Sequence, residues 1–232
     1  MKIKIYADGA NIDDMLKAYK SETVAGFTTN PTLMKKSGVK DYLGFAKKAL
    51  NEIKDKPISF EVFSDEIEEM EKQAYILNDL ADNVYVKIPV TNTQGVTTYD
   101  LISELTKNKV KVNVTAIFTE EQIESVADSI LDSTPSVISI FAGRIANAGV
   151  DPEPIMKYAT ELTKNNPEKE ILWASPREAL NIIQAERCGC DIITVTPDII
   201  SAMSTFGKDL EEYSLETVKM FYDDAIAAGF RI

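Results

Sequence analysis

Histidine is absent from this 232-residue sequence, and cysteine occurs only at Cys188 and Cys190. Without an imidazole the chain cannot form a Ser-His-Asp or Cys-His catalytic group, an H-E-x-x-H zinc site or a histidine acid–base pair. Two cysteines spaced C-x-C provide neither a disulfide framework nor the paired C-x-x-C motifs of a zinc site. The glycine-rich nucleotide motifs GxGxxG and GxxxxGK(S/T) are missing as well. An enzyme of this composition has to work with carboxylates, lysines, hydroxyl groups or a bound cofactor.

The chain is also poor in basic residues and in long apolar runs. Its 25 Lys and Arg against 37 Asp and Glu give a formal net charge of −12, which argues against nucleic acid and against an anionic membrane as partners. No run approaches the roughly 18 apolar residues of a membrane span, and the start MKIKIYADG lacks the apolar stretch of a signal peptide. Because two cysteines suit a reducing compartment, we expect a cytoplasmic location.

The sequence does contain a regular alternation of short Val- and Ile-rich runs with longer stretches of helical periodicity. The short runs lie at 3–7, 24–28, 58–62, 84–88, 111–115, 136–140, 170–174 and 191–195. The helical stretches lie near 12–20, 31–54, 66–81, 94–107, 119–131, 152–165, 176–187 and 197–228. Strands that alternate with helices form a parallel sheet.

Eight such units in a chain close to the usual ~250 residues predict an α/β protein, a single-domain (β/α)8 TIM barrel over residues 1–232. A doubly wound open sheet is the alternative. The last helical stretch is longer than one barrel helix needs. It therefore predicts a C-terminal helical extension over about 206–232, which could serve in assembly.

Within the predicted strands, apolar and polar residues alternate. In 84–88, Val84, Val86 and Ile88 share one face, whereas Tyr85 and Lys87 share the other. A barrel strand packs one face on its helices and points the other into the lumen, so the polar face is predicted to point inward. Near the strand ends, where barrel active sites lie, this face contains Asp8, Thr28, Glu61, Lys87, Asn113, Ser139 and Ser175. The alternative is a sheet with one solvated face.

Lys87 is the first candidate for chemistry, because it lies within the apolar strand VYVKIPV. A lysine buried without a partner tends to lose its proton, and a neutral amine can form a Schiff base with a ketone or aldehyde. The alternative is a lysine that extends to solvent or pairs with a glutamate. The position in the strand does not decide between the two.

Carboxylates and neutral polar groups are predicted around this lysine. Asp8 and Glu61 could share the proton transfers of Schiff-base chemistry, with Thr115 holding a water molecule. Alternatively, one of the carboxylates forms a structural ion pair with the lysine. Asn30, Asn113 and Ser139 are suited to sugar hydroxyls, although each could equally serve in a turn or at a strand end.

Only four arginines occur, and two of them, Arg144 and Arg177, follow strand ends in FAGRIAN and ASPREAL. Two guanidinium groups at one rim of an acidic barrel indicate a site for a phosphate or carboxylate. Each could instead be part of a surface salt bridge. No ligand set for a metal is predicted.

Five motifs, in their order and spacing, resemble the transaldolase family, in particular its short bacterial and archaeal branch, which also contains the fructose 6-phosphate aldolases. They are GFTTNPTL at 26–33, VYVKIPVT at 84–91, VNVTAIF at 112–118, SIFAGR at 139–144 and ASPR at 174–177. The resemblance extends from the first strand to about residue 205. It implies a (β/α)8 barrel, no metal and no cofactor.

The resemblance also implies a role for each matching residue. Lys87 would form the Schiff base with a ketose phosphate, and Asp8 would take the hydroxyl proton as the carbon–carbon bond breaks. Glu61 and Thr115 would position the catalytic water. The phosphate would be bound by Arg144, Ser175 and Arg177, and the rest of the substrate by Thr28, Asn30, Asn113, Ser139 and Phe141.

The implied reaction moves a dihydroxyacetone unit from sedoheptulose 7-phosphate or fructose 6-phosphate to glyceraldehyde 3-phosphate or erythrose 4-phosphate, in the pentose phosphate pathway. Free aldolases resemble this pattern but have Gln in place of Glu61 and Tyr in place of Phe141, so this pair favours transfer. An aldolase without an acceptor and a catalytically idle barrel that serves in binding or assembly are the alternatives. Short relatives form homo-oligomers, which implies a pentamer or decamer.

Several positions depart from the family pattern. Gly9 replaces a Ser or Thr, Ile140 replaces a Pro, and Pro176 replaces a larger residue. Glu178 follows the phosphate arginine where a neutral residue is usual, and the segment beyond 205 is atypical. These departures bear on the acceptor and on phosphate affinity rather than on the chemistry at Lys87.

Overall fold

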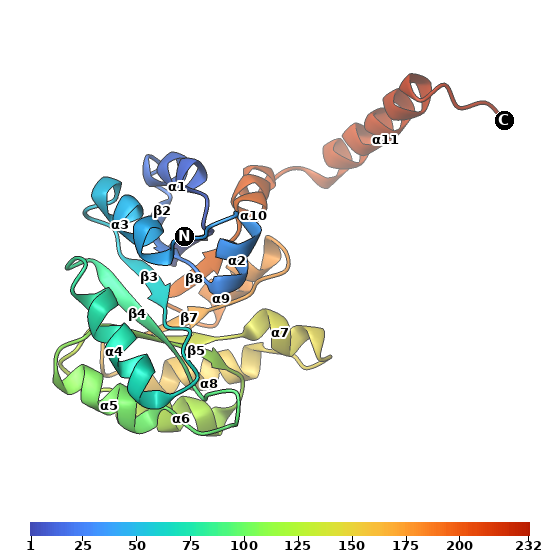
Figure 1. The fold of residues 1–232 in the computed structure, drawn as a ribbon. Helices are drawn as coiled ribbons and strands as arrows, with labels where there is room; N and C mark the ends of the chain where they lie inside the picture. The colour runs from blue at the N-terminus through green and yellow to red at the C-terminus, as the bar shows by residue number, and fades with distance from the viewer.

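Eight parallel strands close into a barrel in the order of the chain (Figure 1), in a computed structural model that describes residues 1–232. The strands are β1 (Lys4–Asp8), β2 (Val24–Thr28), β3 (Ile58–Glu61), β4 (Val84–Pro89), β5 (Val112–Ile117), β6 (Ser136–Ile140), β7 (Lys169–Trp173) and β8 (Ile192–Val195). β1 pairs with both β2 and β8, which closes the ring. The predicted (β/α)8 barrel is therefore confirmed, and the open sheet is excluded.

Helices surround the barrel on the outside (Figure 1). They are α1 (Ile12–Tyr19), α2 (Pro31–Lys36), α3 (Tyr42–Glu52), α4 (Ile67–Asn78), α5 (Tyr99–Lys107), α6 (Glu120–Ser129), α7 (Ala142–Asn147), α8 (Glu153–Thr163), α9 (Leu180–Arg187), α10 (Pro197–Ala202) and α11 (Leu210–Ala227). A single 3-10 turn, η1 (Met203–Thr205), follows α10.

The helix boundaries differ from the prediction in three places. The stretch 31–54 forms two helices, because Gly38 adopts a φ of 73° after α2 and Asp41 then caps α3 through the amide of Gly44. The stretch 197–228 is divided among α10, η1 and α11. The short helix α7 was not predicted, since its six residues follow a strand directly and show no helical period.

The two faces of the sheet form separate apolar clusters. The outer faces of the strands pack with the helices in a cluster of 49 buried residues, which includes Val84, Val86 and Ile88. Inside the barrel, a second cluster of 5 buried residues closes the lower lumen: Tyr6, Val137, Leu172, Ala174 and Ile192. A Cβ on Gly26 would lie 2.6 Å from the Tyr6 ring, so a glycine on β2 leaves room for this aromatic ring. Apolar side chains thus fill one part of the lumen, and polar side chains line its carboxyl-terminal mouth.

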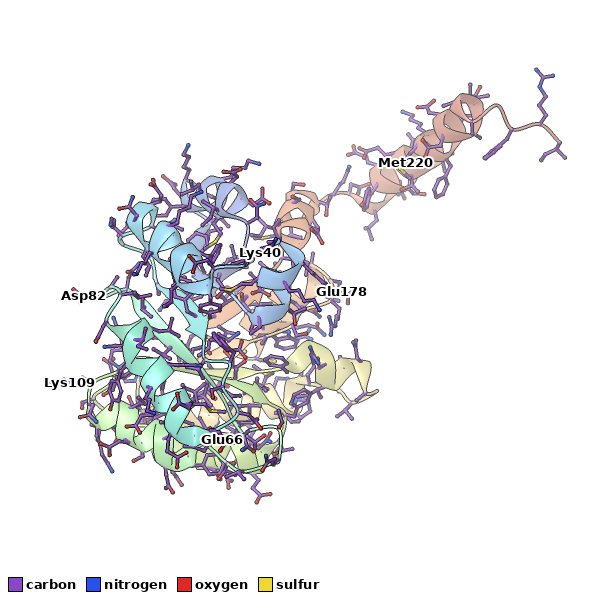
Figure 2. The ribbon with its side chains drawn as sticks, in the orientation of Figure 1. Lys40, Glu66, Asp82, Lys109, Glu178 and Met220 are labelled. Atoms are coloured by element: carbon purple, nitrogen blue, oxygen red, sulfur yellow. The ribbon has the colours of Figure 1, made fainter.

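The last helix, α11, leaves the barrel and projects away from it (Figure 1), with Met220 far from the other helices (Figure 2). None of its residues is buried, although it is rich in large apolar side chains. Leu215, Val218, Tyr222 and Ile226 lie three or four residues apart and form one stripe along the helix. Neither this helix nor any other in the chain is long and apolar enough to cross a membrane.

Candidate active site

The polar strand ends meet in one cavity of about 540 Å³ at the carboxyl-terminal mouth of the barrel. Every residue predicted to act in catalysis or substrate binding lines it: Asp8, Thr28, Asn30, Glu61, Lys87, Asn113, Thr115, Ser139, Phe141, Arg144, Ser175 and Arg177. The inward orientation of the polar face, inferred from its alternation, is therefore correct. The structure brings these residues together but does not test their roles.

A second cavity of about 510 Å³ lies beside the first and shares Asp8, Leu33 and Lys36 with it. It lies between α1, α2 and α10, and Lys87, Glu61 and the two rim arginines do not line it. Of the residues predicted to act in catalysis or substrate binding, Asp8 therefore lines both cavities and the others line the first.

Lys87 lies in the lumen with only 9% of its side chain exposed. Its Nζ is 3.1 Å from Glu61 Oε2 and donates a hydrogen bond to the carbonyl oxygen of Thr29 at 3.0 Å. The β3–β4 register places Glu61 directly beside Lys87. Lys87 therefore forms the ion pair with a glutamate that was one of the alternatives, and it lies buried among the candidate catalytic groups. Glu61 is the nearest acceptor for a proton leaving the amine.

Asp8 ends β1 and accepts a hydrogen bond from Thr28 Oγ1 at 2.8 Å. Burial raises the pKa of this carboxyl above its usual value, while the charge of Lys87 and the hydrogen bond from Thr28 act in the opposite direction. The charge of Glu61 adds to the upward shift. A carboxyl with a raised pKa can both accept and return a proton near neutral pH, which suits an acid–base group.

Neutral polar groups form a chain under the lysine. Asn113 donates through Nδ2 to Ser59 Oγ at 3.0 Å and accepts from Ser139 Oγ at 2.6 Å. Thr115 Oγ1 is buried and has no hydrogen-bond partner in the protein, so it is free to bind a water molecule or a substrate hydroxyl. Asn30 accepts from the amide of Leu33 at 2.9 Å and caps α2, which is the turn role that the sequence left open.

The two rim arginines come from adjacent segments that pack closely. Arg177 Nε donates to the carbonyl oxygen of Gly143 at 3.4 Å, and Arg144 lies over the Phe141 ring at 5.5 Å. A Cβ on Gly143 would lie 1.6 Å from the carbonyl oxygen of Ser175, so only glycine allows this approach. With its amide oxygen toward the guanidinium, Asn147 accepts from Arg177 Nη2 at 3.1 Å.

Neither Arg144 nor Arg177 forms an ion pair with a carboxylate, and the surface salt-bridge alternative is therefore wrong for both. Two exposed guanidinium groups without acidic partners, at the rim of the cavity, form a candidate anion site. No group of three or more Cys, Asp or Glu side chains is gathered where a metal ion could bind.

The sequence analysis missed several residues that line or support the cavity. Thr194 of β8 contacts the Thr28 hydroxyl, and Ser59 of β3 accepts a hydrogen bond from Asn113. Lys36 and Phe118 also line the cavity, and Phe118 packs on Phe141 at 5.7 Å between ring centroids. Ser59 shares the inward polar face of its strand with Glu61, so the alternation signal could have found it, and Phe118 ends the motif VNVTAIF; no motif marked Thr194 or Lys36.

Comparisons with known proteins agree with this architecture. The family described as Transaldolase/Fructose-6-phosphate aldolase matches residues 5–232. A "Probable transaldolase" of Caldicellulosiruptor saccharolyticus is 34% identical over 207 residues, which cover 87% of this chain and 89% of that one. A "Probable transaldolase" of Methanococcus maripaludis is 32% identical over 215 residues, which cover 92% and 94%.

Among solved structures, a flavocytochrome b2 variant with sulfite bound superimposes with a TM-score of 0.57 at 10% identity, covering 90% of this chain and 60% of that chain. At this level of identity the likeness concerns the fold alone.

The raised pKa of Asp8 predicts how stability depends on pH. A carboxyl whose pKa is raised on folding binds more protons in the native than in the unfolded chain, so the free energy of unfolding falls as the pH rises from the unfolded pKa through the native one. Asp8→Asn should therefore be more stable than the wild type at pH 7, by about 1–3 kcal/mol. The gain should shrink as the pH falls toward 4.

Urea unfolding of both proteins between pH 4 and 8 measures this difference. Asp128→Asn, which changes an exposed carboxyl on α6, is the matched control and should change stability little at any pH. A wild type more stable than Asp8→Asn at neutral pH, or a gain that does not vary with pH, would contradict the assignment.

Proposed function

The chain belongs to the transaldolase/fructose-6-phosphate aldolase family, and from this membership we propose that it transfers a dihydroxyacetone unit from a ketose phosphate to an aldose phosphate through a Schiff base on Lys87. One observation supports the proposal above all: a buried lysine shares a single cavity with two carboxylates and two arginines that have no acidic partners. We further propose the cytoplasm and the pentose phosphate pathway as its setting.

In the proposed reaction, Lys87 Nζ adds to the C2 carbonyl of the donor and water leaves, which gives the protonated imine. The C3–C4 bond then breaks, and its electron pair moves into the imine to form an enamine. Asp8 takes the proton of the C4 hydroxyl, and the first aldose phosphate departs. The enamine carbon attacks the aldehyde of the acceptor, Asp8 returns its proton to the new hydroxyl, and water hydrolyses the imine.

The other polar groups are assigned from their positions. Glu61, at 3.1 Å from the amine, and the unpartnered hydroxyl of Thr115 are suited to receive the proton of Lys87 and to hold the water that leaves and returns. The Ser59–Asn113–Ser139 chain is suited to the hydroxyls of the dihydroxyacetone unit. Glu61 together with Phe141, rather than Gln and Tyr, favours transfer over free aldol cleavage.

The anion site is needed for an electrostatic reason. A chain with a formal net charge of −12 repels a phosphorylated sugar at long range, so local positive charge has to supply the attraction. Arg144 and Arg177, together with Lys36, are exposed cations that line the cavity and form no ion pair with a carboxylate. We therefore propose that Arg144 and Arg177 bind the phosphate together with Ser175, whose backbone lies against Gly143 in the segment of Arg144.

We also propose that copies of this chain assemble through α11, as the pentamers or decamers of the family resemblance imply. The stripe formed by Leu215, Val218, Tyr222 and Ile226 lies on a helix without a single buried residue. Since a helix of this kind gains most of its stability from packing its apolar side chains, a second copy of the chain is the partner we expect.

Trapping of the Schiff base tests the proposed function. Borohydride reduction with fructose 6-phosphate should leave a stable adduct on Lys87, detected by peptide mass spectrometry. Lys87→Arg should abolish it, because a guanidinium stays protonated and cannot form an imine. Lys169→Arg is the matched control, since Lys169 is also largely buried but pairs with Asp132 outside the cavity.

Absence of an adduct on the wild-type protein would favour the idle barrel. If the adduct forms but added erythrose 4-phosphate does not raise donor turnover, the chain is a free aldolase rather than a transferase.

Replacement of a rim arginine tests the phosphate site. Arg177→Ala should raise KM for phosphorylated donors about 10- to 100-fold, the equivalent of a lost charge-assisted hydrogen bond, and should leave KM for dihydroxyacetone nearly unchanged. Arg187→Ala, which removes a guanidinium paired with Glu153, should change neither value. Equal effects on phosphorylated and unphosphorylated substrates would refute the assignment.

Charges introduced into the apolar stripe of α11 test assembly. Val218→Glu with Tyr222→Glu should reduce the mass measured by light scattering after size-exclusion chromatography. Lys219→Glu, on the polar face that it shares with Glu216 and Asp223, should leave it unchanged. A wild-type chain that is monomeric at micromolar concentration would overturn this part of the proposal.

A further inference from the structure

We propose that Thr194 is a positioning residue that acts through Thr28 to hold Asp8 in the form that accepts a proton. The inference rests on the proposed function and adds to it a residue that neither the motifs nor the comparisons single out. The three side chains come from β8, β1 and β2, which are neighbours around the closed barrel. Thr28 and Thr194 are only 3% and 6% exposed.

The hydrogen bonds form a short chain with one favoured direction. Thr28 Oγ1 donates to Asp8 Oδ1 at 2.8 Å and also contacts Thr194 Oγ1. A hydroxyl has one proton, and an ionised carboxylate only accepts, so with Asp8 ionised the Thr28 proton is committed to Asp8. Thr194 must then donate its own proton to the Thr28 oxygen. In this direction every donor in the chain has an acceptor.

The opposite direction is less well satisfied. If Asp8 were protonated and donated to Thr28, Thr28 would donate to Thr194, and the Thr194 proton would need an acceptor in turn. Thr194 Oγ1 forms no other hydrogen bond within the protein, so its proton would have to find its acceptor in the cavity that Thr194 lines. A hydrogen bond to an ionised carboxylate is also stronger than one between neutral groups, and the chain therefore stabilises the ionised carboxylate over the protonated acid.

Charged groups surround Asp8 from several elements: Lys87, Glu61 and Lys36 in the mouth cavity, and Asp14, Lys17 and Asp198 in the neighbouring cavity that Asp8 also lines. Lys87 on β4 favours the ionised form, whereas Glu61 on β3 and the burial of the site disfavour it. Lys36 on α2 lines the same cavity from its exposed edge. The hydroxyl groups of Thr28 and Thr194 are thus uncharged groups that oppose the effect of burial on Asp8. The Thr194 hydroxyl is the last group in this chain of hydrogen bonds.

The pH dependence of kcat/KM tests the inference with three variants. Thr194→Val keeps the shape but removes the hydroxyl, and it should move the acidic limb upward by about half to one pH unit, the equivalent of one hydrogen bond. Thr194→Ser keeps the hydroxyl and should restore the wild-type limb. Thr163→Val removes another buried hydroxyl, which bonds only within α8, and should leave the profile unchanged.

A second measurement does not depend on turnover. The carboxyl carbon resonance of Asp8, assigned by its loss in Asp8→Asn, should titrate at higher pH in Thr194→Val than in the wild type. Thr194→Ala gives the same readout if the valine variant does not fold. This titration stands even if borohydride trapping shows that the proposed function is wrong. The inference would be overturned if neither the acidic limb of kcat/KM nor the Asp8 resonance shifts in Thr194→Val. It would also be overturned if both shift equally in Thr194→Ser.

Discussion

The ion pair between Lys87 Nζ and Glu61 Oε2, at 3.1 Å in the closed lumen, is the contact on which the arrangement of the cavity depends. A buried ammonium without a partner is costly, and removing one member of a buried pair leaves the other uncompensated. The β3–β4 register places the two residues side by side, and β5 places Asn113 on the other side of Lys87. The barrel therefore holds the Lys87 amine in place by strand register rather than by a loop.

The deep end and the rim of the cavity differ in burial and in hydrogen bonding. Around Lys87 the groups are buried and connected by hydrogen bonds, so small changes in their contacts shift proton positions strongly. At the rim, Arg144 and Arg177 are exposed, and neither forms an ion pair with a carboxylate. Gly143 connects the two arginine segments, because its lack of a side chain lets α7 lie against the backbone of Ser175. The candidate catalytic groups and the candidate anion site are thus separated along the depth of the barrel.

The departures from the family pattern lie outside the reacting groups. Ile140 is fully buried in the outer cluster, where it adds to the packing between strand and helices. Gly9 leaves open space around the position that a side chain would occupy. Glu178 is exposed (Figure 2), its amide is bound by Asn181, and its side chain forms no ion pair with Arg177. The guanidinium of Arg177 is therefore not paired with this acidic neighbour in the chain.

The sequence by itself determined the eight strands and the inward direction of their polar residues, because alternation with period two depends only on neighbouring positions. Tertiary structure decided the rest. The Lys87–Glu61 pair follows from register, and Thr194 meets Thr28 only because β8 closes on β1. Gly143 of α7 approaches Ser175, which lies beyond β7 and far along the chain. Such contacts join residues separated by tens of positions, and no local pattern of a single sequence encodes which of them meet.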